Sequence, residues 1–221
     1  MLLEIKRGEL MQKTRSQSPA RFARRLNYQP KVYTNINLNQ LVSEGVLECY
    51  IPMGDYTCTV VFGYVLDEII DELNRMDSPS INLQLIIRAL ARAYDESDLL
   101  VDCSCPDFYY RMSYWASKYG YKAGKMQTIP AKVRNPDDTE GAVCKHLTAL
   151  LNNKTWLVKV ASVVNNYLDK TPDLVSMIFD YVDTDEDDEF DVIEDEYDEY
   201  DENEYDDEEF DMIEDELDEE E

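Results

Sequence analysis

The last 39 residues decide how much of this chain can fold. Residues 183–221 contain 27 Asp and Glu residues and no Lys or Arg. Carboxylates at this density repel one another and bring little apolar surface, so we expect residues 183–221 to form a disordered acidic tail. Residues 1–182 hold 21 acids and 21 bases, so the net charge of −27 belongs to the tail. A neutral stretch of about 180 residues is long enough to bury one hydrophobic core.

The acidic tail contains an internal repeat. The segment EFDVIEDEYDE at 189–199 returns as EFDMIEDELDE at 209–219. This pattern has two interpretations: a low-complexity expansion that copied one block, or two short motifs that dock on a basic, partly apolar partner surface. The apolar residues that the second interpretation needs are Phe190, Val192, Ile193, Phe210, Met212 and Ile213.

The N-terminal region has the opposite charge. Residues 1–31 carry eight bases and two acids, and we assign residues 1–39 to a basic arm, flexible or partly helical; the alternative is an ordinary solvated terminus. The first residues lack the apolar core of a signal peptide, and no run of 18 apolar residues predicts a membrane span. Five Cys, an odd number, favour a reducing compartment in which thiols serve as ligands or core residues.

Residues 40–182 have the pattern of an α+β domain. Two segments within 46–62 are rich in β-branched and aromatic residues and flank Gly54-Asp55, which predicts a β-hairpin. We expect about five helices, and six segments carry helical signals: 66–76, 83–94, 107–119, 144–153, 155–168 and 173–182. A short buried strand is expected at 99–101, and residues 120–143 are loop-like.

Two short pairs of metal-ligand residues lie inside this domain. Cys103-Ser-Cys105 follows the strand expected at 99–101, and Cys144-Lys-His146 begins a predicted helix. Zn²⁺ takes four sulfur or nitrogen ligands in a tetrahedron, and Cys3His is a common structural set. The spacing therefore predicts one structural zinc site; the alternative is three buried thiols and a surface histidine. For the remaining thiols, Cys49 and Cys58 on the hairpin, we expect core packing rather than a facing pair.

The order Cys-x-Cys, spacer, Cys-x-His resembles the SWIM-type zinc finger over residues 98–155. The resemblance implies the ligands Cys103, Cys105, Cys144 and His146, and binding to DNA or protein. The spacer of 38 residues is long for that family. The wider runs DCSCPDFYYRMSYWA and IPAKVRNPDDTEGAVCKHLTALLNNKTWLVKVASVVNNYL also look like putative structural proteins of tailed, crAss-like bacteriophages. That second resemblance implies a setting in the virion or the host cytoplasm.

The spacer between the ligand pairs combines bases with aromatic residues. No acid occurs between Phe108 and Pro136. Bases attract phosphate and aromatic rings can stack on unpaired nucleobases, so this segment predicts contact with nucleic acid or an acidic partner. The alternative is that the rings pack a helix on the core while the bases are solvated. The candidate contact residues are Arg111, Lys118, Lys122, Lys125, Lys132, Arg134, Tyr114 and Trp115.

These features predict a binding protein and not an enzyme. The sole His is assigned to the metal, no phosphate-binding Gly-rich loop occurs, and four protein ligands leave zinc no open position for reactive water. We expect a zinc-dependent binding or assembly module, associated with a phage virion, that contacts nucleic acid or other virion proteins. A homo-oligomer and a basic partner for the tail are further options. The alternative is a DNA-binding protein whose acidic tail mimics DNA and inhibits it.

Overall fold

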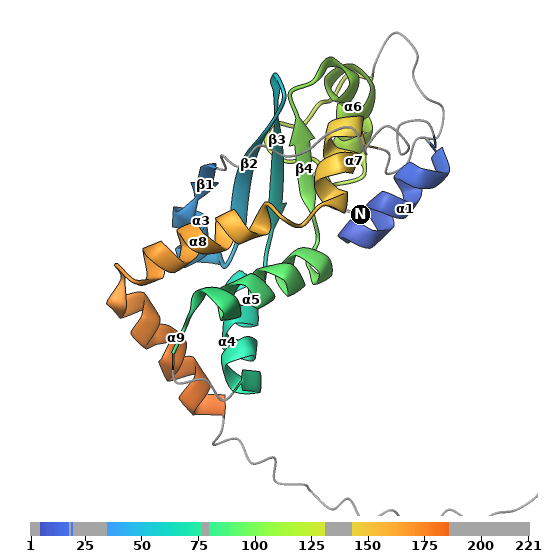
Figure 1. Ribbon diagram of the computed structural model, residues 1–221. Helices are drawn as coiled ribbons and strands as arrows, with labels where there is room; N and C mark the ends of the chain where they lie inside the picture. Colours follow the sequence, from blue (N-terminus) through green and yellow to red (C-terminus); the bar gives the residue numbers. More distant parts are fainter. Residues whose placement is uncertain (1–4, 18, 20–34, 77–79, 131–142, 186–221) are drawn as a thin grey trace, which may run out of the picture. The chain divides into compact units, whose positions relative to one another are not determined.

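The computed structural model describes residues 5–17, 19, 35–76, 80–130 and 143–185. Its architecture is α+β, as the sequence predicts, with one four-stranded antiparallel sheet and helices packed around it (Figure 1). Residues 186–221 of the acidic tail, residues 1–4, 18 and 20–34 of the basic arm, and Lys132 and Arg134 lie outside the described residues. Their predicted roles therefore remain predictions. Residues 183–185, assigned to the tail, are instead the end of a helix in the structure.

The sheet is built on the predicted hairpin. Its strands are β1 (Asn35–Asn37), β2 (Leu47–Met53), β3 (Tyr56–Phe62) and β4 (Leu100–Cys103), and they lie in this order. Met53 pairs with Tyr56, so Gly54 and Asp55 form a two-residue turn. Gly54 has a φ of 69°, a conformation that two-residue hairpin turns require and that glycine adopts without a steric cost.

Burial alternates along the strands because successive side chains point to opposite faces of a sheet. In β2 every second residue is buried, and β3 continues the same buried face through Cys58, Val60 and Phe62. Residues Leu47, Cys49, Ile51 and Met53 are the buried set of β2. One face of the sheet thus belongs to the core.

The helices that follow the hairpin form most of the remaining core. They are α4 (Val65–Met76), α5 (Leu83–Glu96), α8 (Leu157–Leu168) and α9 (Pro172–Asp185). Helix α5 packs against α4 and α8, and α4 packs against α9. Phe62, Tyr94 and Trp156 meet edge to face, with ring centroids 5.4–6.5 Å apart, and join the sheet to α5 and the start of α8.

Three elements lie in or next to the span assigned to the basic arm: α1 (Arg7–Gln17), β1 and α3 (Leu38–Glu44). Helix α1 is not a separate arm in the structure, because it contributes Ile5, Leu10 and Met11, on and just before the helix, to the buried core. It contacts α5 and α7 (Lys145–Asn152). The apolar residues of this segment are few and are not spaced at regular helical intervals. Hydrophobic periodicity therefore did not predict a packed helix here.

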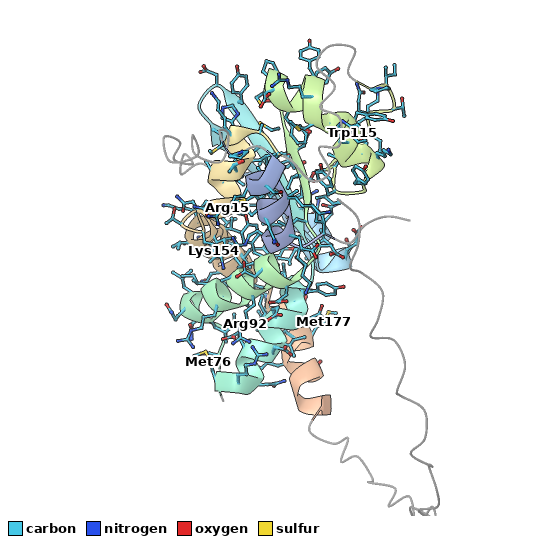
Figure 2. The ribbon with its side chains drawn as sticks, turned by 90° about the vertical axis from the view of Figure 1, so that its right-hand side faces the viewer. Arg15, Met76, Arg92, Trp115, Lys154 and Met177 are labelled. Atoms are coloured by element: carbon cyan, nitrogen blue, oxygen red, sulfur yellow. The ribbon has the colours of Figure 1, made fainter. Side chains whose placement is uncertain are left out.

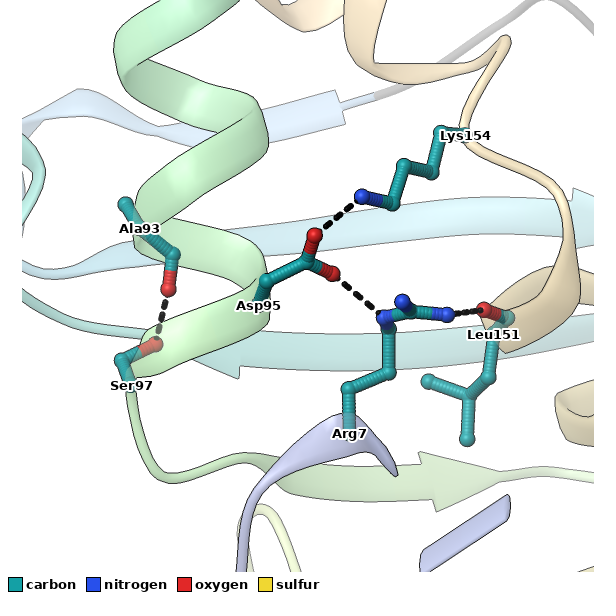
Figure 3. A network of polar contacts seen from close by, with 6 residues as sticks. All are labelled: Arg7, Ala93, Asp95, Ser97, Leu151 and Lys154. Carbon is teal, nitrogen blue, oxygen red and sulfur yellow. Dashed lines mark hydrogen bonds and ion pairs between the residues drawn. The ribbon is translucent and has the colours of Figure 1, made fainter. Parts of the chain in front are cut away.

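A polar network fixes α1 against the domain (Figure 3). The Arg7 guanidinium donates to Asp95 Oδ1 at 2.6 Å and to the carbonyl oxygen of Leu151 at 3.1 Å, and its Cζ lies 5.6 Å from the ring centroid of Tyr94. Lys154 donates to the other carboxylate oxygen of Asp95. Arg7 therefore connects three helices that are distant in the sequence.

Two short helical segments occupy the predicted helix at 107–119. They are η2 (Phe108–Met112), which is a π-helical turn, and α6 (Ser113–Lys118). Figure 1 shows η2, α6 and α7 gathered beside the end of β4. Among the described residues, no helix combines the length and the apolar character needed to cross a membrane.

Candidate metal centre

The four predicted ligands come from the ends of three elements. Cys103 is the last residue of β4, and Cys105 lies between that strand and η2. Cys144 directly precedes α7 as its N-cap residue, and His146 is in the first turn of that helix. The structure therefore has the predicted order of strand, Cys-x-Cys, insertion, Cys-x-His and helix.

The fold brings these four side chains together in the interior. Their ligand atoms all lie within 4.8 Å of one another, and Cys103 Sγ is 3.9 Å from His146 Nδ1. A tetrahedral zinc ion with Zn–S bonds of about 2.3 Å places its ligand atoms roughly 3.5–3.8 Å apart. All four residues are at most 3% exposed. The cluster can hold a metal ion with small inward shifts of its side chains, and its ligands suit zinc.

Backbone bonds near the ligands fix their positions. The Ser104 N–H donates to Thr57 O at 3.0 Å, and the Ser104 hydroxyl accepts from the Thr57 N–H at 2.9 Å, so the turn after β4 is tied to β3. The Phe108 N–H donates to Cys105 Sγ at 3.3 Å. Such bonds orient ligands and stabilise negative charge on sulfur.

The second ligand pair is held in a similar way. The carbonyl oxygen of Cys144 accepts from both the N–H and the hydroxyl of Thr148, each at 2.9 Å. The Tyr56 ring lies 5.0 Å from the His146 ring, centroid to centroid. These contacts fix the start of α7, and with it both ligands.

The pKa values of the three cysteine thiols in the cluster are shifted in different directions. Hydrogen bonds from Cys103 and Cys144 lower the pKa of Cys105, so its sulfur is the first to become a thiolate. The hydrogen bond to Cys105 raises the pKa of Cys103, and burial raises the pKa of Cys144. A set with one thiolate beside two protonated thiols can accept a divalent cation by releasing protons.

One residue near the cluster was not predicted to be there. Cys58 lies on β3 opposite Cys103, and its thiol donates to Cys103 Sγ at 3.6 Å. Cys49 and Cys58 are both fully buried, which confirms core packing. They do not face each other, because Cys49 pairs with Val60 and Cys58 with Ile51. Only the pairing of β3 with β4 reveals the proximity of Cys58 to the ligands.

The aromatic residues of the spacer divide between surface and interior. Tyr109 and Tyr110, on the π-helical turn, are 55% and 65% exposed, and their rings meet edge to face at 5.0 Å. Tyr121 is buried. Trp115, labelled in Figure 2, is partly buried. Its ring stacks on Tyr119 at 5.8 Å and contacts Tyr114 at 5.3 Å, between ring centroids.

The predicted basic contact residues also differ in their exposure and in their partners. Lys118 and Lys125 are exposed, and the Lys118 ammonium lies 4.7 Å from the Trp115 ring centroid. Arg111 bonds to Asp107 at 3.1 Å. Lys122 is only 7% exposed, and its ammonium donates to Asp102 at 2.8 Å and to the carbonyl oxygen of Ala123 at 3.0 Å. Lys122 therefore stabilises the fold and adds no charge to an exposed patch.

The site and fold together define an α+β protein with a buried Cys3His cluster that can hold a metal ion. In comparisons with known proteins, no family model matches this chain, and no curated protein or solved structure matches it.

Proposed function

We propose that this chain is a non-catalytic, zinc-dependent binding or assembly module with a SWIM-like finger. The observation that carries the proposal is the buried cluster of Cys103, Cys105, Cys144 and His146. Three sulfurs and one imidazole favour zinc over oxygen-seeking cations such as magnesium or calcium. With four protein ligands the ion has no open position, so its role would be to hold β4 and α7 together.

The metal site is coupled to an exposed surface. Cys105 accepts a hydrogen bond from Phe108, the first residue of the turn that carries Tyr109 and Tyr110. Zinc at Cys105 would therefore fix the orientation of both exposed rings. The same spacer also carries the exposed lysines Lys118 and Lys125, and exposed rings together with bases suit stacking on unpaired nucleobases and attraction of phosphates. We propose nucleic acid as the first partner to test, and a virion protein as the second.

The proposed setting is a tailed-phage particle, and it rests on the resemblance of the segments around both ligand pairs to phage structural proteins. The alternative function is a DNA-binding protein that its own acidic tail inhibits. The tail carries 27 acids, enough to compete with phosphates for an exposed basic surface. The two functions differ in what removal of the tail would do.

The first experiment is the zinc content per chain, by plasma mass spectrometry, of protein purified without added metal. We expect one zinc in the wild type and in Cys49→Ser, and none in Cys144→Ser. Cys49 is the matched control because it is an equally buried thiol that faces Val60 and is not a member of the ligand set. A folded wild-type protein without zinc would overturn the proposal.

The second experiment tests the surface. Binding of a fluorescein-labelled oligodeoxythymidine at low salt is measured for the full chain and for the double variant Tyr109→Ala, Tyr110→Ala. We expect binding to weaken at least tenfold in the double variant, since stacking contributes about 1–3 kcal/mol per base. Tyr64→Ala is the control, because Tyr64 is 60% exposed on the link between β3 and α4. Equal binding by both variants would direct the search to protein partners.

A further inference from the structure

Cys58 is outside the four-ligand set but touches it. It stands opposite Cys103 in the pairing of β3 with β4, and the two sulfurs are 3.6 Å apart. Both residues are buried, with exposures of 0% and 2%. Two sulfurs at this separation in a fixed register can be joined without a rearrangement of the sheet.

The backbone geometry of this pair suits a disulfide. The neighbouring pair, Thr57 and Ser104, carries the ladder hydrogen bond between the strands. Because hydrogen-bonded and non-hydrogen-bonded pairs alternate in antiparallel strands, Cys58 and Cys103 form a non-hydrogen-bonded pair, with Cα atoms about 4.5 Å apart. Disulfides span Cα separations of about 4.4–6.8 Å.

We propose that Cys58 and Cys103 form a redox modification site: a hydroperoxide converts the pair to a disulfide and thereby removes Cys103 from the metal cluster. The metal half of this inference rests on the proposed function, whereas the disulfide half does not. Cys58 supplies the second sulfur, so that oxidation of Cys103 gives a disulfide that a thiol can reduce again.

The chemistry balances with hydrogen peroxide as the oxidant. The Cys103 sulfur attacks one peroxide oxygen, the O–O bond breaks, and the thiol proton joins the departing oxygen, so that Cys103 sulfenic acid and water form. The Cys58 sulfur then displaces the sulfenic oxygen, which leaves as water with the Cys58 proton. Two electrons pass from the two sulfurs to peroxide. A zinc ion held by Cys103, Cys105, Cys144 and His146 would lose one of its four ligands in this reaction.

A small oxidant has a short path to this pair. Ser104 and Pro106, the residues on either side of Cys105, are exposed, so the Cys-x-Cys segment runs directly beneath the surface. Cys49 lies on the same hairpin but pairs with Val60, so it offers no second sulfur across the strands. Cys49 and Cys58 are equally buried, but only Cys58 has a sulfur opposite it on the neighbouring strand. Cys49 is therefore a matched control.

The test treats the zinc-loaded full chain with hydrogen peroxide and follows zinc release with a chromogenic chelator. In parallel, peptides are analysed by tandem mass spectrometry without reduction. We expect a crosslink between Cys58 and Cys103, about one zinc released per chain, and recovery of both dithiol and zinc after addition of dithiothreitol and Zn²⁺. Zinc release from Cys58→Ser should be at least tenfold slower, and release from Cys49→Ser should match the wild type.

The outcomes separate this inference from the proposed function. A crosslink between Cys103 and Cys105, or between Cys105 and Cys144, in place of the expected one would overturn the inference, as would release from Cys58→Ser at the wild-type rate. If Cys58→Ser does not fold, Cys58→Ala replaces it, and the crosslink map of the wild type decides without any variant. A protein that forms the expected crosslink but purifies without zinc would refute the proposed function alone.

Discussion

The Thr14 hydroxyl accepts a hydrogen bond from the Val143 N–H at 3.2 Å, across 129 residues of sequence. Thr14 is fully buried in α1 and donates its own proton to the carbonyl oxygen of Leu10 at 2.8 Å. Val143 immediately precedes Cys144, the first ligand of the second pair. The N-terminal helix thus holds the backbone next to two members of the Cys3His cluster, Cys144 and His146.

Thr14→Val should destabilise the protein by about 1–3 kcal/mol, because the variant keeps the shape of the side chain but leaves a buried N–H without an acceptor. Urea unfolding with a fixed slope measures this change. Zinc affinity should fall with it, because the position of Cys144 becomes less fixed. Ser16→Ala is the control: Ser16 is on the same helix, but it is exposed and bonds only locally to Lys13 O. Equal stability of the two variants would contradict the role of Thr14.

Arg7→Met should cost about 1.5–3 kcal/mol of unfolding free energy, since it removes hydrogen bonds to a carboxylate and a carbonyl between α1, α5 and α7. The neighbouring Lys6 pairs with Glu96, but the side chains of that pair are 52% and 67% exposed. Lys6→Met should leave the melting temperature almost unchanged, because solvent screens exposed ion pairs. Thermal unfolding of both variants checks the contrast, and a larger loss in Lys6→Met would contradict it.

Zinc affinity should rise with pH. The pKa values of Cys103 and Cys144 are raised in the metal-free cluster, by the bond to Cys105 and by burial respectively, so both thiols carry protons at neutral pH. Binding must displace these protons, and each one changes the apparent affinity about tenfold per pH unit. We therefore expect the protein to retain zinc at high pH and to lose it as the pH falls. Competition with a chelator of known affinity at several pH values measures the slope, and a flat profile would exclude this ligand set.

The sequence predicted correctly that Cys103, Cys105, Cys144 and His146 cluster, because each pair is local: a two-residue spacing next to a strand or a helix already places two donors together. The hairpin was equally predictable, since alternating burial and the Gly54 turn are properties of adjacent residues. Relationships between distant segments could not be read in the same way. Cys58 approaches Cys103 only because β3 pairs with β4 in one register.

Two further positions show the same limit. Lys122 looks like one of a series of solvated bases, but a parallel bridge between Val101 and Lys122 draws this residue to the sheet, where Asp102 neutralises it. In α1, Thr14 looks like any polar helix residue, and its burial depends on the segment before α7. In both cases the residue is buried by contact with a segment that is distant in the sequence, and the residues next to it in the sequence do not reveal that contact.

Truncation after Asp185 should separate the two candidate functions. The cut keeps every described element through α9 and removes most of the acids that set the net charge of −27. If the tail competes with nucleic acid for the exposed residues of the spacer, the truncated chain should bind labelled oligodeoxythymidine at least tenfold more tightly at low salt, and the gain should shrink as salt screens both interactions. A matched chain that keeps the tail length but carries Asn and Gln in place of its Asp and Glu residues distinguishes charge from bulk: it should bind like the truncated chain. Unchanged affinity on truncation would leave the tail free to recognise a basic partner, as an assembly protein requires.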